Sequence, residues 1–597
     1  MFEPDSRALL SELLQPPLGF RLEHAVGTTF TLNLESALSV PLAFASTRTG
    51  EDDRIGVLNA LREAADRVEI FAQAGSISLP KMNDLVALLE PMVHPIGMVG
   101  RLFHPKVWFL EFSADDERRY RFISSSRNLT DDVTWDAVVT LDGRPTARVD
   151  ASLSRKNEAM AALLEWLPGN TVQRMPPTRA QRIRALAAAW RSIQWEHPPE
   201  AHEVDVHVLG IGRGRIPIER GRQALLVSPF VSTEGITSLR ARPGGRTLLI
   251  ARPEQLDRLA PASFGDGLTL HVLDEAATLV DEAGDPQPAS RATLTGLHAK
   301  VVVHDGPNKS RMLIGSANAT AAAWHSNVEV MVDIVGSTRT IGVDATFDAI
   351  RPLLEDYQTV GGAEQSEDEA AEWRLEDALR RLANAQLVLR VLQDDPYALE
   401  LRREDLTAAD PLSDAQVPPH IRWHLVTRPD IGGIGLPPAG HPFRSPSLQL
   451  REITPFVVLI AEDEEGRTRR TVLVARLDDD VPERRDAIIA SQLTSPEAFA
   501  RFLRLLLEPG ATLGRVDGDA AGSTWAMLGS GVADDGSGFL ELLVRAAGAT
   551  HDGLDELDRV LRQFSDEERV RAVPAGFDTI WSSVTRARQQ LREARDD

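Results

Sequence analysis

The stretch "GLHAKVVVHDG", residues 296–306, places a histidine and a lysine two positions apart at the head of an apolar run. Val301, Val302 and Val303 follow, and such a run of β-branched residues predicts a β-strand. Residues i and i+2 of a strand share one face, so His298 and Lys300 are expected to project side by side. Because a buried charge is costly unless it is paired, we expect this strand to present the two groups to a partner.

A second pair of the same kind, His104 and Lys106, lies in "GRLFHPKVWFLEF", residues 100–112. The chain has five lysines among its 65 basic residues, and two of the five follow a histidine by two positions. The sequence after each pair also recurs, as "RYRFISSSRNLT" (119–130) with "TWDAVVTLDG" (134–143), and "SRMLIGSANAT" (310–320) with "NVEVMVDIVG" (327–336). Each copy predicts strand, turn, strand, a small-residue corner with Asn, loop and strand.

The pattern predicts a duplicated α/β domain with halves near 25–150 and 201–350. Apolar strands alternate with helical segments upstream of each copy, which is typical of βαβ units and a mostly parallel sheet. A helix is expected over 178–195, and "GGAEQSEDEAAEW" (361–373) has the composition of an acidic linker. In the C-terminal part, residues 455–477 predict a hairpin, and 495–509 and 553–564 predict helices. The predicted division is therefore a first half (1–150), a helical linker (151–200), a second half (201–360) and a C-terminal α/β interaction or regulatory module (361–597).

Composition narrows the class of protein. At 597 residues the chain is too long for one core. The net charge of −23 argues against a protein that coats polyanions, although it leaves room for a local basic groove. The absence of cysteine excludes disulfides, thiolate zinc sites and cysteine nucleophiles. With neither a secretory signal nor an apolar run of roughly 18 residues, we expect a cytoplasmic protein without stable membrane insertion.

The doubled motif resembles the phospholipase D superfamily, whose signature is His-x-Lys-x4-Asp followed by Gly-Ser-x-Asn. The second copy matches it in full with His298, Lys300, Asp305, Gly315, Ser316 and Asn318. In the first copy Glu111 stands at the Asp position and Ser125 at the Gly position, ahead of Ser126 and Asn128. The resemblance implies a duplicated α-β-α sandwich over about residues 25–350, with two motifs forming one pseudo-two-fold site.

The chemistry of such a site follows from the substrate's charge. Lys106 and Lys300, with Asn128 and Asn318, would neutralise the non-bridging oxygens of a phosphodiester. One neutral histidine can attack phosphorus while a second, protonated histidine donates to the leaving oxygen, which explains two motifs. The resemblance implies that His104 is the nucleophile and His298 the general acid. This mechanism needs no metal or other cofactor, and the sequence has no "HExxH" motif.

Carboxylates that orient the histidines are expected on the third strand of each copy, at Asp136 and Glu329. These are the acids at matching places in both copies. Glu111 and Asp305 each lie seven residues after their histidine, on the opposite face of a regular strand. They receive supporting roles, as do Ser126 and Ser316.

Roles are also predicted for two further segments, an arginine-rich segment before the second copy and residues 28–35. Arg213, Arg215, Arg220 and Arg222 precede the second copy and could line a nucleic-acid groove together with Arg179, Arg182 and Arg184, or could form a solvated surface. The segment "TTFTLNLE" (28–35) is expected to serve core packing.

Three functions remain open from sequence. The first is a metal-independent nuclease that cleaves DNA rather than RNA, resembling the restriction and phage-defence nucleases of the superfamily, with residues 361–597 docking a helicase or ATPase. The second is a phospholipase or phosphatidyl transferase. The third is a catalytically silent scaffold that binds a phosphate-containing ligand or nucleic acid. Oligomeric state cannot be read from the sequence.

Overall fold

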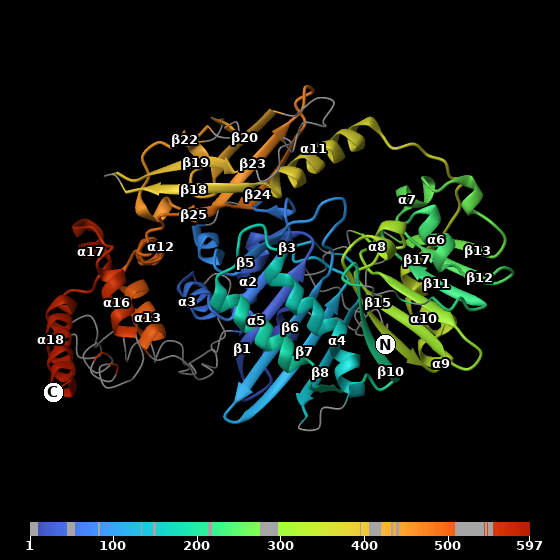
Figure 1. Ribbon diagram of the computed structural model, residues 1–597, viewed down its shortest axis with the longest axis horizontal. Helices are drawn as coiled ribbons and strands as arrows, with labels where there is room; N and C mark the ends of the chain where they lie inside the picture. Colours follow the sequence, from blue (N-terminus) through green and yellow to red (C-terminus); the bar gives the residue numbers. More distant parts are fainter. Residues whose placement is uncertain are drawn as a thin grey trace, which may run out of the picture.

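The computed structural model is a mixed α/β protein in which two large sheets lie side by side and smaller C-terminal sheets lie above the first of them in the view of Figure 1. The structure describes residues 10–44, 54–80, 84–132, 134–146, 151–212, 216, 218–274, 296–393, 396–404, 420–431, 434–437, 441–507, 543, 546 and 553–596. Within this part of the chain, no helix is both long and apolar enough to cross a bilayer.

The first large sheet has seven strands in the order β5-β3-β1-β6-β7-β8-β9. Their bounds are β1 (Arg21–Thr29), β3 (Val68–Gln73), β5 (Val93–Ile96), β6 (Val107–Ala114), β7 (Glu117–Ser125), β8 (Val138–Pro145) and β9 (Ile193–Trp195). β5, β3 and β1 are parallel, and all pairs from β1 through β6 to β9 are antiparallel.

The second large sheet has eight strands in the order β10-β16-β15-β14-β11-β12-β13-β17. Their bounds are β10 (Ala201–Leu209), β11 (Gln223–Val227), β12 (Arg246–Ile250), β13 (Leu268–Leu273), β14 (Val301–Asp305), β15 (Ser310–Gly315), β16 (Glu329–Gly336) and β17 (Leu354–Tyr357). Only β11, β12 and β13 are parallel neighbours among these strands.

The expectation of a mostly parallel sheet is therefore wrong. In each sheet the first two strands after the histidine–lysine pair, β6 with β7 and β14 with β15, are joined by a short turn, which reverses the chain so that they pair antiparallel. The third strand, β8 or β16, follows a longer connection and also pairs antiparallel. Asp115, in the turn between β6 and β7, adopts a positive φ of 46°, a conformation that Asp and Asn tolerate in tight turns. The parallel pairs are confined to the strands before each motif, where helices supply the crossovers.

Helices cover both faces of each large sheet. On the first sheet, α2 (Leu34–Phe44), α3 (Arg54–Ala64) and η1 (Asp84–Leu89) pack on one face, and α4 (Ala151–Trp166) and α5 (Pro177–Trp190) pack on the other. On the second sheet, one face carries α6 (Thr233–Leu239), α7 (Pro253–Asp257) and α8 (Ala321–His325), and the other carries α9 (Thr338–Ile341) and α10 (Val343–Ile350). The remaining elements of this region are α1 (Leu10–Leu14), β2 (Leu32–Asn33), β4 (Ile77–Ser78), η2 (Leu167–Gly169), η3 (Pro261–Ser263) and η4 (Arg351–Leu353).

The two large sheets share one hydrophobic core. Phe109 and Phe122 of the first sheet belong to the same buried cluster as Val206, Val301 and Val332 of the second. Each Å² of apolar surface removed from water contributes roughly 25 cal/mol to the free energy of folding. A close-packed cluster of this kind therefore holds the two sheets at a fixed distance. The ends of β6 and β14, where the two histidine–lysine pairs lie, are thereby brought to one place.

The predicted helix at 178–195 is shorter than expected, since α5 ends at Trp190 and Ile193–Trp195 adds β9 to the first sheet. The arginines of this helix do not form one solvated surface. Arg179 is buried and donates through Nη1 to Glu69 Oε1 at 2.8 Å, while His94 Nε2 lies 2.6 Å from the other oxygen of Glu69. Burial would raise the pKa of Glu69, but His94 and Arg179 lower it. Arg179 therefore fastens α5 to the sheet and is unavailable to nucleic acid.

The C-terminal part contains two four-stranded sheets, β22-β19-β18-β25 and β21-β20-β23-β24. The strands are β18 (Gln386–Leu392), β19 (Ala398–Glu404), β20 (His420–Leu425), β21 (Ile434–Gly435), β22 (Phe443–Arg444), β23 (Phe456–Glu462), β24 (Thr468–Val474) and β25 (Arg476–Asp478). The helices are α11 (Glu367–Ala383), η5 (Pro429–Ile431), η6 (Leu450–Glu452), α12 (Arg484–Gln492), α13 (Pro496–Leu507), α16 (Gly553–Leu561), α17 (Asp566–Ala572) and α18 (Phe577–Asp596). The predicted hairpin (β23 and β24) and the predicted helices (α13 and α16) are confirmed.

The predicted acidic linker is largely helical instead. Ser366 accepts from Glu369 N and Glu369 accepts from Ser366 N, which together form a capping box at the start of α11. The acids that suggested a linker occupy the first turn of this helix, where negative charge offsets the helix dipole.

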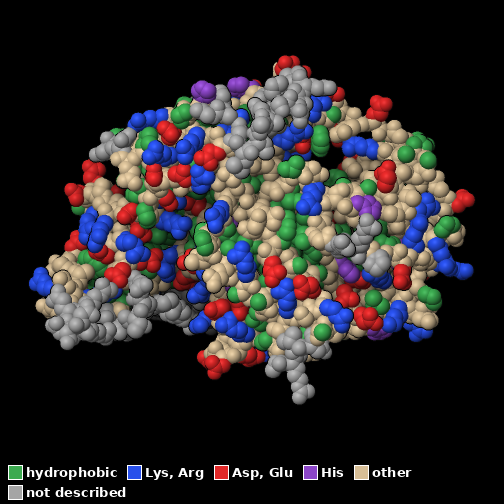
Figure 2. All heavy atoms as spheres, viewed as in Figure 1, with side chains coloured by type: hydrophobic (Ala, Val, Ile, Leu, Met, Phe, Trp, Pro, Cys, Tyr) green, Lys and Arg blue, Asp and Glu red, His purple; other side chains and the backbone are tan. Residues whose placement is uncertain are grey.

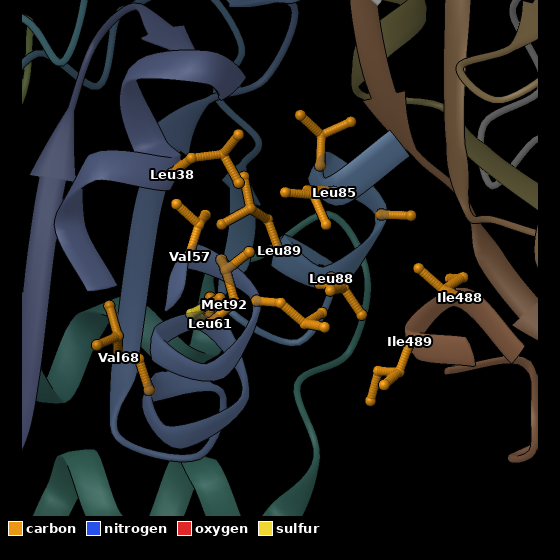
Figure 3. Packing of buried hydrophobic residues seen from close by; sticks show 14 of the residues in the cluster. Leu38, Val57, Leu61, Val68, Leu85, Leu88, Leu89, Met92, Ile488 and Ile489 are labelled. Atoms are coloured by element: carbon orange, nitrogen blue, oxygen red, sulfur yellow. The ribbon is translucent and has the colours of Figure 1, made fainter. Parts of the chain in front are cut away.

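The C-terminal helices pack directly against the first large sheet. Ile488 and Ile489 of α12 point toward Leu85 and Leu88 of η1, and all four belong to one buried cluster (Figure 3). A buried ion pair crosses the same interface, because Arg484 Nη1 lies 2.5 Å from Glu90 Oε2 with side-chain exposures of 4% and 3%. Thr454 donates to the other oxygen of Glu90 at 2.8 Å. The packing thus joins residues 441–507 to the first sheet through both apolar and charged contacts.

Replacing Arg484 by Ala should destabilise the protein strongly, since Glu90 would be left as a buried charge without its partner. Breaking a buried pair in this way costs about 3–5 kcal/mol. Arg562→Ala is the matched control, because the Arg562–Asp558 pair is largely exposed and should contribute at most about 1 kcal/mol. Urea unfolding followed by tryptophan fluorescence measures both. Equal midpoints for the two variants would contradict the assignment of Glu90–Arg484 as a structural pair.

Candidate functional site

The two histidine–lysine pairs lie just before β6 and β14, not inside these strands. β6 begins at Val107 and β14 at Val301, each one residue after the lysine. The expectation that a regular strand presents the pair is therefore wrong in detail. The backbone N–H groups of His298 and Ala299 both donate to Trp135 O, at 2.8 and 2.9 Å, so they are not available to a neighbouring strand of their own sheet.

Each pair is held by the segment that leads into the third strand of the other copy. Phe103 forms a parallel bridge with Val328, and Leu297 forms one with Trp135. His104 N donates to Val328 O at 2.9 Å, which places the first pair beside the start of β16. Glu329 follows Val328, so it is carried toward His104, whereas Asp136, which follows Trp135, comes near Lys300.

His104 and Glu329 form a hydrogen-bonded dyad across the two segments. His104 Nδ1 lies 2.9 Å from Glu329 Oε2, and the Glu329 side chain is 0% exposed. Ser316 Oγ also donates to Glu329 Oε2. A carboxylate accepts the Nδ1 proton, which leaves the lone pair of Nε2 free. Burial lowers the pKa of His104 to about 4 despite the opposing effect of Glu329, so the imidazole is neutral at pH 7.

His298 has a different environment. Its Nδ1 lies 3.4 Å from Lys300 Nζ, and within the described residues no carboxylate is hydrogen-bonded to this ring. Burial, followed by the charges of Lys300 and Lys106, lowers the pKa of His298 to about 2. The Ser126 carbonyl is the group that favours the protonated form. The two histidines are therefore electrostatically unequal.

Lys106 and Lys300 are buried, with exposed fractions of 2% and 1%. Lys106 Nζ donates to His104 O at 2.9 Å, and Lys300 Nζ donates to His298 O at 2.8 Å. In the described part of the chain, neither ammonium has a carboxylate within ion-pair distance. Burial lowers the pKa of both, that of Lys300 to about 7. The site thus holds two buried amino groups that donate to backbone carbonyls, and that of Lys300 also lies 3.4 Å from His298 Nδ1.

The asparagine corners bring amide groups to the same region. Asn128 Oδ1 accepts from Thr31 N at 3.3 Å. Asn318 Oδ1 is buried without a hydrogen-bond partner among the described residues, while its backbone carbonyl accepts from Trp324 Nε1 at 2.9 Å. Ser126 Oγ accepts from Ala137 N at 2.9 Å, so this serine aligns the start of β8 as Ser316 aligns β16.

Asp136 approaches Lys300 but is not hydrogen-bonded to His298. Burial raises the pKa of Asp136, and the charges of Arg127 and Lys300 oppose that rise. The motif acids lie elsewhere. Glu111 accepts from Tyr120 OH at 3.2 Å and pairs with Arg118, whereas Asp305 accepts from Ser310 Oγ at 2.7 Å and from Val343 N at 3.0 Å.

Two of the arginines predicted to bind nucleic acid, Arg220 and Arg222, are not brought to this site. Arg220 and Arg222 precede β11, whose register places Ala224 beside His304 and Val227 beside Val301. They therefore lie at the end of the strand away from Lys300, and Arg220 donates to the carbonyls of Arg240 and Ala241. Arg213 and Arg215 lie outside the described residues.

Aromatic side chains at the site were missed by sequence reasoning. The ring of Phe30 lies edge-on to His104 with centroids 5.0 Å apart, so the segment 28–35 contributes more than core packing. Phe230 is 42% exposed, and Arg252 lies 5.0 Å over its ring while donating to Leu297 O at 3.0 Å. A comparison of the two copies could have predicted these residues, because Phe30 lies just after β1 and Phe230 lies just after β11.

Three side-chain amides hold the loop that precedes His104, and these too were missed. Gln73 Oε1 accepts from Phe103 N at 2.7 Å, and Asn327 Oδ1 accepts from Leu102 N at 3.1 Å. Asn384, at the C-cap of α11, donates to Met98 O at 3.2 Å. Asn327 also donates to Glu329 Oε1 at 3.5 Å. The histidine loop is thus positioned from the first sheet, the second sheet and the C-terminal part together.

Comparisons with known proteins add little to this geometry. No protein-family model matches the chain, and no curated protein matches it. A polyphosphate kinase structure from Porphyromonas gingivalis is similar at 13% identity and TM-score 0.32, over 62% of this chain, which spans about half (51%) of that protein. A phosphatidylserine synthase from Haemophilus influenzae Rd KW20 is similar at 12% identity and TM-score 0.32 (63% of this chain, 90% of that one). Yeast tyrosyl-DNA phosphodiesterase is similar at 11% identity and TM-score 0.33 (56% and 86%). These similarities are too weak to assign a family or a function.

The lowered pKa of His298 makes stability depend on pH. Below the unfolded value of about 6.5 the unfolded chain binds a proton at this position and the folded protein does not, so stability falls as pH falls. His298→Asn removes this titration. Below pH 6, the free energy of unfolding of the variant should therefore fall less steeply than that of the natural protein, by about 1 kcal/mol per pH unit. Urea unfolding at pH 7.0, 6.0 and 5.0 measures the difference. The exposed His420→Asn serves as control, and parallel pH curves for His298→Asn and the natural protein would refute the expectation.

Proposed function

We propose that the protein is a phosphodiesterase that acts through a covalent phosphohistidine and needs no metal. The observation that carries this proposal is the pair of buried lysines, Lys106 and Lys300, whose amino groups donate to backbone carbonyls and, among the described residues, form no ion pair with a carboxylate. Because a buried positive charge is costly unless it is paired, these lysines favour a ligand with negative charge. A phosphodiester between the two lysines would supply it, within reach of two neutral histidines.

We further propose that the two motif segments arose by duplication and form one pseudo-two-fold site. Phe103–Val328 and Leu297–Trp135 are equivalent bridges when the motifs are superposed by sequence. Ser126 and Ser316 likewise make equivalent bonds to the starts of β8 and β16. One phosphate would then be bound by a histidine and a lysine from each copy.

The unequal surroundings of the histidines support their division of roles. His104, whose Nδ1 proton is held by Glu329, would attack phosphorus through Nε2 and form the N–P bond. The P–O bond to the leaving group breaks as protonated His298 gives its proton to that oxygen. The bound anion would offset the charges of Lys300 and Lys106 and so raise the pKa of His298 toward the range of an acid. Neutral His298 then takes a proton from water, which attacks phosphorus and releases His104.

Nucleic acid, DNA before RNA, is the proposed substrate. Phe230 with Arg252 above it lies next to the segment that carries His298, and an exposed ring beside a cation suits a stacked base. Figure 2 shows Lys and Arg side chains interspersed with Asp and Glu over the visible face, not gathered into one stripe. Binding would accordingly depend on local contacts at the site. A helicase or ATPase partner for residues 361–597 remains a prediction from the sequence.

Hydrolysis of single-stranded DNA and of bis(p-nitrophenyl) phosphate in excess EDTA tests the proposal. We expect the natural protein to cleave both, and His104→Asn to lose at least about 10³-fold in rate. The exposed His325→Asn, near the second motif, is the matched control and should keep full activity. Acid-quenched intact mass should show a phosphorylated adduct on the natural protein. Activity lost on chelation, or retained by His104→Asn, would refute the mechanism.

Glu329→Gln tests the dyad by keeping the shape and removing the charge. An amide can donate to Nδ1 and favour the wrong tautomer, so kcat should fall by about 10²- to 10⁴-fold. Because burial would then act on His104 without a counter-charge, the rate should also decline less steeply toward acidic pH. A kcat within about threefold of the natural protein's would show that Glu329 does not orient His104.

A further inference from the structure

A cavity of about 820 Å³ adjoins the site on the side of the first sheet. Lys106, Asn128 and Asp136 line it, and its other walls come from α1, α2, α3, η1 and the corner after β7. This volume is in the range of small-molecule pockets. The cavity therefore offers room for a group attached to a phosphate bound at Lys106.

The inner wall is apolar and rigid. Leu38, Val57 and Leu85 line it, and Figure 3 shows them directed toward the same packed cluster. Trp108, near the start of β6 and two residues after Lys106, completes this wall. Its ring rests against Gly27, where an added Cβ would lie 2.5 Å from Cζ3, so the ring cannot move further into the sheet. A flat, uncharged group would find a matching surface here.

The rim of the cavity is acidic and polar. Among the described residues that line it, Lys106 and Arg127 are the cations, whereas Glu35 and Asp131 are acids. Asp131 is held in place by Asn33 Nδ2 at 3.1 Å, and Arg127 donates to Thr130 O at 2.9 Å. A strand that continued past this rim would bring its next phosphate beside the carboxylates of Glu35 and Asp131, which Arg127 offsets only in part, whereas nucleic-acid sites normally gather lysine and arginine. A long acyl chain is also disfavoured, because it would meet these acids and the hydroxyl of Ser39.

We infer that the cavity receives the terminal nucleoside of a nucleic-acid strand, so that cleavage starts at a strand end. The inference rests on the proposed phosphodiesterase function and names its substrate class. The scissile phosphate lies at Lys106, the base packs against Trp108 and the leucines, and the sugar meets the hydroxyls of α2. The uncharged terminal nucleoside fills the cavity, and the rest of the strand leaves the site on the side of Phe230.

The test compares a linear single-stranded oligonucleotide with the same sequence closed into a circle, in EDTA, with bis(p-nitrophenyl) phosphate in parallel. We expect mononucleotides as the first products and a linear strand cleaved at least about 10-fold faster than the circle. Equal rates on circle and linear strand, with internal fragments, would overturn the inference and leave the proposed function standing. Hydrolysis of the small diester without cleavage of the linear strand would also overturn it. No hydrolysis of the small diester by the natural protein would instead overturn the proposed function.

Two variants probe the cavity itself. Ser39→Trp fills it and should lower kcat/KM on linear DNA about 10-fold more than on the small diester. Ser582→Trp, on the exposed face of α18, is the matched control and should alter neither. Glu35→Lys replaces an acid of the rim by a cation and should raise cleavage of the circle relative to the linear strand. If neither cavity variant changes the ratio of the two DNA rates, the terminal nucleoside does not bind in this cavity.

Discussion

Two ammonium groups, those of Lys106 and Lys300, are buried side by side at the junction of the two large sheets, and the geometry of the site follows from how they are accommodated. Their hydrogen bonds go to the carbonyls of His104, His298 and Ser126. Glu329 is the nearby acid whose charge favours both ammonium forms. Because this acid is itself bonded to His104 and Ser316, one buried carboxylate serves the lysines and a histidine at once. In the proposed function, a bound phosphodiester supplies the negative charge beside these two lysines.

The electrostatic inequality of the histidines arises from the same arrangement. His104 is bonded to Glu329, whereas His298 has the ammonium of Lys300 3.4 Å from its Nδ1. Asp136 occupies the place in the first copy that Glu329 occupies in the second, yet it lies near Lys300 and Arg127. Two copies of one motif therefore need not perform one role twice. In the proposed mechanism, these differences in the neighbours prepare His104 for attack and His298 for proton transfer.

The C-terminal part forms a hydrogen bond with the loop before His104 and a buried ion pair with the first sheet. Asn384 of α11 bonds the loop before His104, and Arg484 forms a buried pair with Glu90 at the edge of the first sheet. Displacement of α11 would remove one of the three amides that position the histidine loop. The C-terminal residues thus belong to the framework that positions the loop before His104.

The local pattern of the sequence located the two histidine–lysine pairs and the hairpin that follows each of them, since His-x-Lys spacing, strand alternation and short turns are properties of neighbouring residues. It also separated Glu111 and Asp305 from the histidines, because strand parity is local. Tertiary structure alone decided that Glu329 meets His104, a residue 225 positions away, and that Arg179 is buried while Arg220 and Arg222 lie at the far end of β11. It also decided that Phe30, Asn327 and Asn384 surround the histidine loop. The physical reason is that these contacts depend on how the two sheets pack against each other. The free energy of that packing is a sum over the whole core, so no single stretch of sequence predicts it.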